Sequence, residues 1–238
     1  MTTASSHERL IFVHGSGDSA SAWKPLRALL TEWQSLAVDL PGHGARVAEP
    51  GPEEMSARNY AEDVYRTLAD QGIDGGVIVG HSLGGAIALR LAVDHPDFAR
   101  RIVLVGSGAR LRVAPALLEQ ARADGPEAGK AIAALAFAPN HEAQMRAYFR
   151  AQAPLAPGML YRDLAACDAF DMMAELDAIN QPALMIVGAE DRLTPLKYAE
   201  FLGQRLATAT LVIVPDAGHY VQVEQPSAVA NALREWLK

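Results

Sequence analysis

The stretch VIVGHSLGGAIALRLA, residues 77–92, changes its pattern in the middle. Its first residues form a continuous apolar run of strand length, whereas the residues after Gly84 are apolar with helical spacing. Gly80, Gly84 and Gly85 surround Ser82 at the junction. The motif Gly80-His81-Ser82-Leu83-Gly84 between a strand and a helix predicts a nucleophile elbow. In such a turn the backbone is strained, the serine hydroxyl projects above the sheet, and glycines stand where a side chain would collide.

Short apolar runs alternate with helical patterns along most of the chain. The runs have the length of β-strands and are apolar on both faces, which favours parallel strands covered by helices on both sides. They occupy residues 9–13, 35–40, 76–80, 101–106, 183–188 and 210–215. Helical patterns lie between them at residues 20–32, 56–71, 84–94, 195–206 and 226–237. The alternation predicts an α/β fold with a doubly wound, mostly parallel sheet.

One long segment interrupts this alternation. Residues 109–178 contain no convincing strand, and helical patterns occupy residues 114–123, 127–137, 141–152 and 159–176. Ligands bind at the carboxyl edge of doubly wound sheets, so we expect this insertion to form a helical cap over that edge. The expected organisation is therefore a core domain of residues 1–108 and 179–238 with a cap of residues 109–178.

The composition restricts the class of protein. Half of the 238 residues are apolar, enough to bury the core of one large α/β domain. The chain has 21 basic against 28 acidic residues and no Lys/Arg block, so we expect no nucleic-acid partner. Cys167 is the single cysteine, which excludes an intrachain disulfide and a thiolate-rich metal site. Neither a signal-peptide pattern nor a membrane-length apolar run is present, so a cytoplasmic protein without a membrane partner is expected.

A serine hydroxyl requires a base to act as a nucleophile, and the base requires an orienting carboxylate. Asp191 follows the strand predicted at 183–188, and His219 lies in the loop after the last predicted strand. Ser82, Asp191 and His219 thus follow three different strands, whose carboxyl ends meet at one edge of a parallel sheet. Glu190 and Asp216 remain alternatives for the carboxylate. The predicted catalytic residues are Ser82, Asp191 and His219.

Small residues also follow the first predicted strand, in Phe12-Val13-His14-Gly15-Ser16-Gly17. Such a turn lets backbone N–H groups face a reaction centre, and the residue after a nucleophile at the start of a helix offers another. We therefore expect the N–H groups of Ser16 and Leu83 to form an oxyanion hole. The alternative is a simple strand-to-helix turn.

Candidate substrate-binding residues are less distinctive than the catalytic ones. Apolar side chains that would line a pocket are Trp23, Phe137, Phe170 and Met172, although apolar residues at helical spacing more often belong to a core. The arginines of the insertion either hold a substrate carboxylate or are solvated; they are Arg110, Arg112, Arg122, Arg146, Arg150 and Arg162.

Taken together, these motifs resemble the α/β-hydrolase superfamily, in particular its capped serine esterases. The resemblance covers nearly the whole chain, because FVHGSGDSASAWKPL, AVDLPGHG, VIVGHSLGG, PALMIVGAEDRLTP and VPDAGHYVQVEQP occur in the order and spacing of that family. It implies that the cap shapes the substrate pocket and that His43 supports a structural turn. The family usually begins with an antiparallel hairpin, for which too few residues precede residue 9. A strand near an exposed sheet edge favours an interface, so we expect a monomer or a homodimer.

The resemblance and the predicted triad together suggest an activity. We expect a serine hydrolase that cleaves carboxylic esters of small to medium size through an acyl-enzyme, with a small-molecule ester as its partner and no metal or organic cofactor. Hydrolysis of carbon–carbon bonds, hydrolysis of lactones and cofactor-free peracid formation use the same triad and remain alternatives. A ligand sensor with slow turnover is another. Dehalogenase and epoxide hydrolase activities are disfavoured, because those members carry an aspartate at the position of Ser82.

Overall fold

A computed structural model describes residues 8–51, 54–123 and 126–238. Six parallel strands form one sheet in the order β2-β1-β3-β4-β5-β6. They are β1 (Leu10–Val13), β2 (Ser35–Val38), β3 (Gly76–His81), β4 (Ala99–Val105), β5 (Ala183–Gly188) and β6 (Ala209–Val214). Each strand overlaps an apolar run of the sequence. The predicted doubly wound α/β fold is confirmed.

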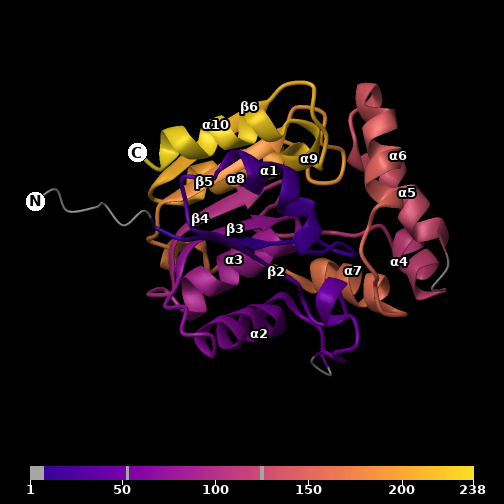
Figure 1. The fold of residues 1–238 in the computed structure, drawn as a ribbon, viewed down its shortest axis with the longest axis horizontal. Helices are drawn as coiled ribbons and strands as arrows, with labels where there is room; N and C mark the ends of the chain where they lie inside the picture. Colours follow the sequence, from indigo (N-terminus) through magenta and orange to yellow (C-terminus); the bar gives the residue numbers. More distant parts are fainter. Residues whose placement is uncertain (1–7, 52–53, 124–125) are drawn as a thin grey trace, which may run out of the picture.

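Helices cover both faces of this sheet because its strands are apolar on both sides. Side chains such as Ile11 and Val13 pack toward α2 (Ala57–Ala69), α3 (Leu83–Asp94) and α8 (Lys197–Arg205). Their alternating neighbours Leu10 and Phe12 pack toward α1 (Lys24–Leu29) and α10 (Pro226–Trp236). Figure 1 shows α10 and α1 above the sheet and α2 and α3 below it.

The parallel register brings the functional loops to one edge of the sheet. Val13 at the end of β1 pairs with Gly80 near the end of β3, and His81 pairs with Val105 at the end of β4. Gly188 and Val214 likewise end β5 and β6 side by side. The loops after β1, β3, β5 and β6 therefore start from the same edge, and they carry the predicted site residues.

The insertion consists of α4 (Pro115–Arg122), α5 (Pro126–Ala136), α6 (Glu142–Arg150) and α7 (Met159–Ala169). Figure 1 shows α4, α5 and α6 together at one end of the molecule, beside α7. The expected helix over 159–176 is too long. It ends at Ala169, because the backbone then pairs with residues 109–111: Leu111 donates to the Phe170 carbonyl and Met172 donates to the Ala109 carbonyl.

The strands at the sheet edges can be compared with the expectation that an N-terminal hairpin is absent. Within the described residues β2 and β6 are the edge strands, and β1 lies between β2 and β3. Residues 1–7 lie outside the described part, so the absence of a hairpin and the oligomeric state stay predictions. No helix in the described segments is long and apolar enough to cross a lipid bilayer.

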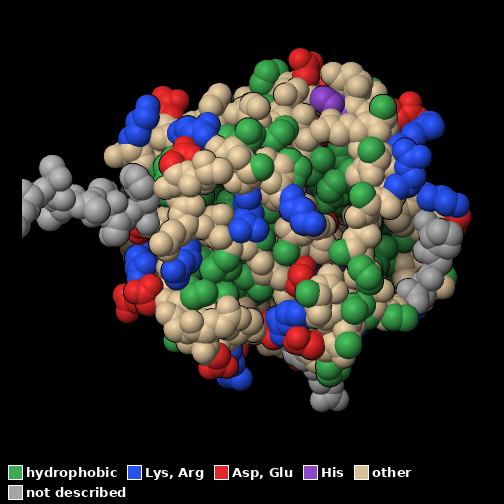
Figure 2. Space-filling model, in the orientation of Figure 1, with side chains coloured by type: hydrophobic (Ala, Val, Ile, Leu, Met, Phe, Trp, Pro, Cys, Tyr) green, Lys and Arg blue, Asp and Glu red, His purple; other side chains and the backbone are tan. Residues whose placement is uncertain are grey.

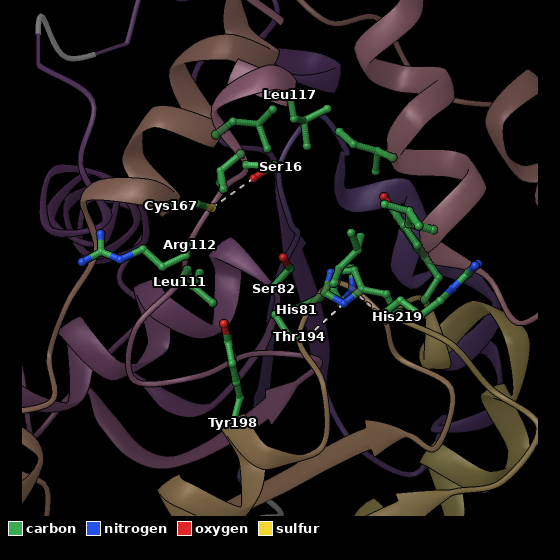
Figure 3. A pocket seen from close by; sticks show the side chains of 18 residues that line it. Ser16, His81, Ser82, Leu111, Arg112, Leu117, Cys167, Thr194, Tyr198 and His219 are labelled. Carbon is green, nitrogen blue, oxygen red and sulfur yellow. Dashed lines mark hydrogen bonds between the residues drawn. The ribbon is translucent and has the colours of Figure 1, made fainter. Parts of the chain in front are cut away.

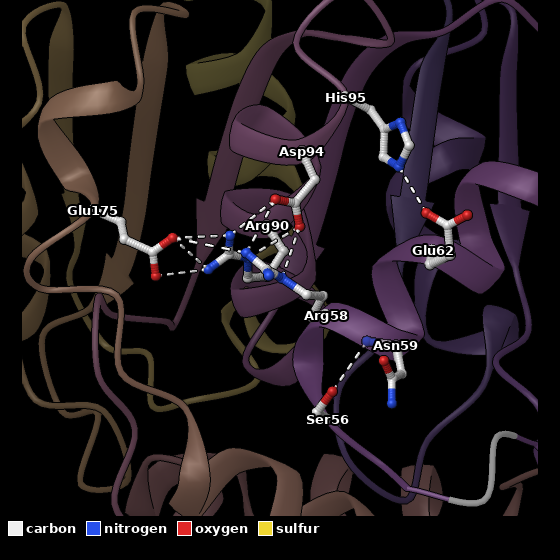
Figure 4. A network of polar contacts seen from close by, with 8 residues as sticks. All are labelled: Ser56, Arg58, Asn59, Glu62, Arg90, Asp94, His95 and Glu175. Carbon is white, nitrogen blue, oxygen red and sulfur yellow. Dashed lines mark hydrogen bonds and ion pairs between the residues drawn. The ribbon is translucent and has the colours of Figure 1, made fainter.

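A polar network ties α2 and α3 to the segment after α7 (Met159–Ala169) (Figure 4). The guanidinium of Arg90 on α3 is only 7 % exposed and contacts Glu175 at 2.9 Å and Asp94 at 3.0 Å. Arg58 on α2 reaches the same two carboxylates, at 3.2 Å from Asp94 and 3.8 Å from Glu175, but is 59 % exposed. Nearby, Ser56 caps α2 by accepting from the N–H of Asn59. The network thereby attaches the segment around Glu175, which leads back to the core, to α2 and α3.

The different burial of these two arginines gives a prediction. Arg90→Met leaves two carboxylates without their central partner and should lower the free energy of unfolding by roughly 2 kcal/mol. Arg58→Met is the matched control and should change it by less than about 1 kcal/mol, since an exposed ion pair contributes little. Urea unfolding of both variants measures the difference, and equal losses would contradict a central role for Arg90.

Candidate active site

Ser82 sits in a strained turn between β3 and α3. Its backbone has φ 52° and ψ −115°, and only Asp216 shares a positive φ among the non-glycine residues of the described chain. Two bonds hold the turn: the Ser82 N–H donates to the Val105 carbonyl at 3.0 Å, and the Ser107 hydroxyl donates to the Ser82 carbonyl at 2.9 Å. Strain of this kind persists only where the surrounding structure fixes it. The serine therefore stands in the geometry of a nucleophile elbow.

The glycines of the motif allow neighbouring backbones to pass at close range. A Cβ on Gly80 would lie 2.0 Å from the carbonyl oxygen of Gly84, and a Cβ on Gly84 would lie 2.2 Å from that of Val13. These contacts are with backbone, which cannot move aside as a flexible side chain can. Only glycine fits at the two positions, as the motif indicates.

His219 and Asp191 meet beside this serine. The Nδ1 atom of His219 lies 2.9 Å from Oδ2 of Asp191, and both side chains are buried. Burial alone would raise the pKa of Asp191, but the charge and hydrogen bond of His219 hold it below its ordinary value. Asp191 is therefore a carboxylate that orients the imidazole. The alternatives Glu190 and Asp216 are exposed, and Asp191 is the one that contacts His219.

Thr194 contacts both members of this pair, although the sequence analysis did not identify it. Its hydroxyl donates to Oδ2 of Asp191 at 2.8 Å and lies 3.1 Å from Nδ1 of His219. Because the ionised carboxylate of Asp191 can only accept, Nδ1 of His219 donates to it, so Nδ1 carries the imidazole proton and Nε2 is free to act as a base. The spacing Asp-x-x-Thr after a strand was the available signal, because the N–H of Thr194 also donates to Asp191.

The loop that carries His219 is fixed by buried polar groups. His81 donates from Nε2 to the His219 carbonyl at 3.0 Å, and burial lowers the pKa of His81 well below its usual value, so this ring is neutral. Glu224 accepts from the N–H of Gly218 at 2.9 Å and from that of Ala138 at 2.8 Å. The loop of His219 is thereby anchored both to the core and to the insertion.

The predicted oxyanion donors belong to the start of α3 and to the turn after β1. Leu83 is the first residue of α3, where helix N–H groups have no partner within the helix. Ser16 lies in the turn after β1, and its hydroxyl is 3.4 Å from the sulfur of Cys167 on α7. The next residue, Gly17, donates its N–H to Asp163 on α7 at 2.7 Å. This turn is therefore attached to the insertion as well as to the sheet.

Asp163 is the centre of a buried polar cluster between the insertion and the core. Its carboxylate is fully buried and accepts from Gly17, from Nε2 of His43 at 2.8 Å and from the Tyr60 hydroxyl. Burial alone would lower the pKa of His43, but the hydrogen bond and charge of Asp163 raise it above 6.5. The sequence suggested His43 as the support of a turn, whereas Asp163 gave no signal because its partners are distant in the chain.

A cavity of about 270 Å³ opens above Ser82 (Figure 3). Ser82 and His219 line it from the core, and the insertion adds mostly apolar side chains. These are Leu111, Val113, Ala114, Leu117, Ile132, Leu135, Leu164 and Cys167. Within the described residues no group of three or more His, Cys, Asp or Glu is arranged to hold a metal ion.

The four residues predicted to line the pocket lie elsewhere, and this corrects the sequence-based expectation. Trp23 packs on Phe12 on the face of the sheet that α1 and α10 cover, with ring centroids 5.0 Å apart. Phe137 stacks on Tyr220, which itself lines the cavity. Phe170 and Met172 are buried in the core cluster, because their backbone pairs with residues 109–111 and turns them inward. Apolar spacing identified buried residues without showing which cavity they face.

Comparisons with known proteins agree with this architecture. A model of the alpha/beta hydrolase family matches residues 10–232, so the chain belongs to that family. It is 31 % identical to the pimeloyl-[acyl-carrier protein] methyl ester esterase of Neisseria meningitidis, over 97 % of this chain and 94 % of that protein. It is 30 % identical to a putative carbamate hydrolase of Caulobacter vibrioides, over 97 % and 90 %. The solved structure of a thermophilic esterase superposes with a TM-score of 0.80 at 33 % identity, covering 97 % of this chain and 89 % of that one.

The close contacts of Gly84 lead to a prediction on stability. Gly84→Ala should lower the free energy of unfolding by about 2–3 kcal/mol, because its Cβ would overlap the Val13 carbonyl. Gly129→Ala on α5 is the control: nothing lies within 4 Å of its added Cβ, so it should raise stability by about 0.5–1 kcal/mol. Chemical denaturation tests both, and a tolerated Gly84→Ala would disprove the steric account.

The His43–Asp163 pair predicts a dependence of stability on pH. A pKa raised in the folded state contributes stability that is fully present below the unfolded pKa and lost as pH rises through the folded one. Asp163→Asn removes the carboxylate, so its cost in unfolding free energy should be larger at about pH 6 than at about pH 9. Thermal unfolding of wild type and variant at both values measures this, and a cost independent of pH would contradict it.

Proposed function

We propose that this member of the family hydrolyses carboxylic esters through an acyl-enzyme formed on Ser82. The observation that carries the proposal is the hydrogen bond between His219 and Asp191 in the same cavity as a serine held at positive φ. A nucleophile, a base with its proton fixed on Nδ1 and an orienting carboxylate are the parts that acyl transfer requires. The esterases among its relatives support the same reaction class.

The geometry suggests two similar half-reactions. In the first, Nε2 of His219 takes the proton of Ser82 as the hydroxyl oxygen attacks the ester carbonyl, and the N–H groups of Ser16 and Leu83 stabilise the oxyanion. The carbon–oxygen ester bond then breaks, and the alcohol leaves with the proton from His219. In the second, His219 activates water, which attacks the acyl-enzyme and releases the acid and free Ser82. Asp191 and Thr194 keep the imidazole oriented in both.

The cavity indicates the kind of acyl group that this site accepts. Aliphatic side chains of the insertion, among them Leu117, Ile132 and Leu135, face the space above Ser82. An apolar acyl chain gains free energy by leaving water for such a surface, at about 25 cal/mol per Å² of buried apolar area. We therefore propose that the enzyme is an esterase that accepts small to medium acyl groups.

Active-site variants test the proposal directly. Hydrolysis of p-nitrophenyl acetate, butyrate and octanoate is followed over time, with fluorophosphonate labelling in parallel. Ser82→Ala should lose the label and roughly 10⁴- to 10⁶-fold in turnover, and Asp191→Asn roughly 10⁴-fold. Glu190→Gln, next to Asp191 in sequence but exposed, is the matched control and should keep wild-type rates.

Two results would count against this function. Retention of more than a tenth of the activity by Ser82→Ala would remove the serine from the mechanism. A stoichiometric burst without further hydrolysis by the wild type would instead indicate a sensor that acylates and does not turn over.

A further inference from the structure

Several cations lie around the catalytic cavity without an acidic partner in the described part of the chain. Elsewhere, many arginines lie beside carboxylates: Arg46, Arg146 and Arg234 contact an acidic side chain at 2.7, 2.5 and 2.6 Å. Others, such as Arg9 and Arg27, donate to uncharged oxygens. Such neighbouring charges of opposite sign are visible around the rim of the face in Figure 2. Within the described residues, by contrast, Arg112, Arg192 and Lys197 have no carboxylate within 4.0 Å. Their positive charge therefore remains available to a ligand.

These three side chains lie at the border of the site. Arg112 and Arg192 line the cavity of Ser82, and their guanidinium groups donate only to backbone carbonyls, those of Asp168 and of Ala134 and Phe137. Figure 3 shows the side chain of Arg112 extending away from Ser82. The charge of Arg112 thus faces a region beyond the point where the ester would react.

That region is a second hollow, of about 350 Å³, which shares Arg112 and Tyr198 with the catalytic cavity. Its other lining residues are Ala109, Arg110, Met173, Lys197 and Phe201. It combines apolar walls with three cations and has no acidic side chain among its lining residues. Arg110 is partly neutralised by Asp171 at 3.6 Å, which leaves Arg112 and Lys197 as its main charges.

Electrostatics favours an anion in this hollow. The whole chain carries a net charge of −7, whereas the residues that line this hollow include three cations and no acidic side chain. Lys197 is also the first residue of α8, where the positive end of the helix dipole disfavours a cation unless an anion is near. An arginine presents a planar fork that matches the oxygens of a carboxylate or a phosphate.

We propose that the ester substrate carries an anionic group at the end of its acyl chain, a carboxylate or a phosphate, and that Arg112 and Lys197 bind this group in the hollow beside the catalytic cavity. The proposal rests on the proposed ester hydrolysis at Ser82 and adds the substrate class. The aliphatic chain would lie in the cavity between Ser82 and Arg112, with Tyr198 on the wall shared by the two spaces.

The test compares two esters of the same chain length that differ in charge. Monomethyl suberate has a free carboxylate at the far end, whereas dimethyl suberate has none. The measured quantity is the ratio of their kcat/KM values, for the wild type, for Arg112→Gln, for Lys197→Gln and for both together. Lys130→Gln on α5 is the control, since Lys130 is exposed and pairs with Glu127. The methyl ester of phosphonooxyoctanoic acid separates phosphate from carboxylate recognition.

The wild type should prefer the charged ester by roughly tenfold, and the double variant should lose most of that preference, mainly through KM. Arg112→Lys should retain part of it, and Lys130→Gln all of it. Raising the ionic strength from about 0.02 M to about 0.5 M should reduce the preference of the wild type, because salt screens exposed charges.

Other outcomes would overturn the inference in distinguishable ways. If the wild type hydrolyses both suberates equally in a Ser82-dependent manner, ester hydrolysis stands and the anion site is refuted. The same conclusion follows if Arg112→Gln and Lys197→Gln lower kcat/KM for both esters to the same extent. If the wild type hydrolyses neither and Ser82 takes no fluorophosphonate label, the proposed function fails and the inference fails with it.

Discussion

The strained backbone at Ser82 is the constraint on which the rest of the site depends. A non-glycine residue at positive φ is unfavourable by roughly 1–3 kcal/mol, so the turn must be held by its neighbours. Here β3, α3 and β4 do this through the close contacts of Gly80 and Gly84 and through the bonds of Ser82 to Val105 and Ser107. Apart from the bond from the Ser107 hydroxyl, these contacts are between backbones, so the position of Ser82 is set mainly by the sheet and α3.

The turn after β1 has a different kind of support, because side chains of the insertion hold it from two sides. Asp163 on α7 accepts from Gly17, and the Tyr148 hydroxyl on α6 donates to Asp18, which is 4 % exposed. Burial raises the pKa of Asp18 to about 6, and the tyrosine hydroxyl opposes that rise. Ser16 lies next to this clamp. The geometry of the proposed oxyanion site therefore depends on helices that are separated from the turn by more than a hundred residues.

This division explains which features the sequence could predict. Strands and the Ser-Asp-His order follow from local patterns, since an apolar run, a Gly-rich turn or a strand end is contained in a few residues. The helix end at Ala169, the pocket lining and the role of Asp163 depend on contacts between distant segments. An apolar residue such as Phe170 has the same local pattern whether it faces the core or a cavity. Thr194 is intermediate: its contact with Asp191 is local in the chain, but no known motif identifies it from the sequence.

Residues of the insertion are attached to the site to different degrees. The end of α5 and the residues after it are bonded to the loop that carries His219: the His219 N–H donates to the Ala136 carbonyl at 2.6 Å, and Ala138 donates to Glu224. Leu117 and Leu135, by contrast, contribute only apolar surface to the cavity, and Leu135 is 41 % exposed. Substitutions at such positions change the shape of the cavity without breaking a bond to the catalytic loops. The fold thereby separates the residues that shape the cavity from those that hold the proposed triad, which is the arrangement expected where one fold serves many substrates.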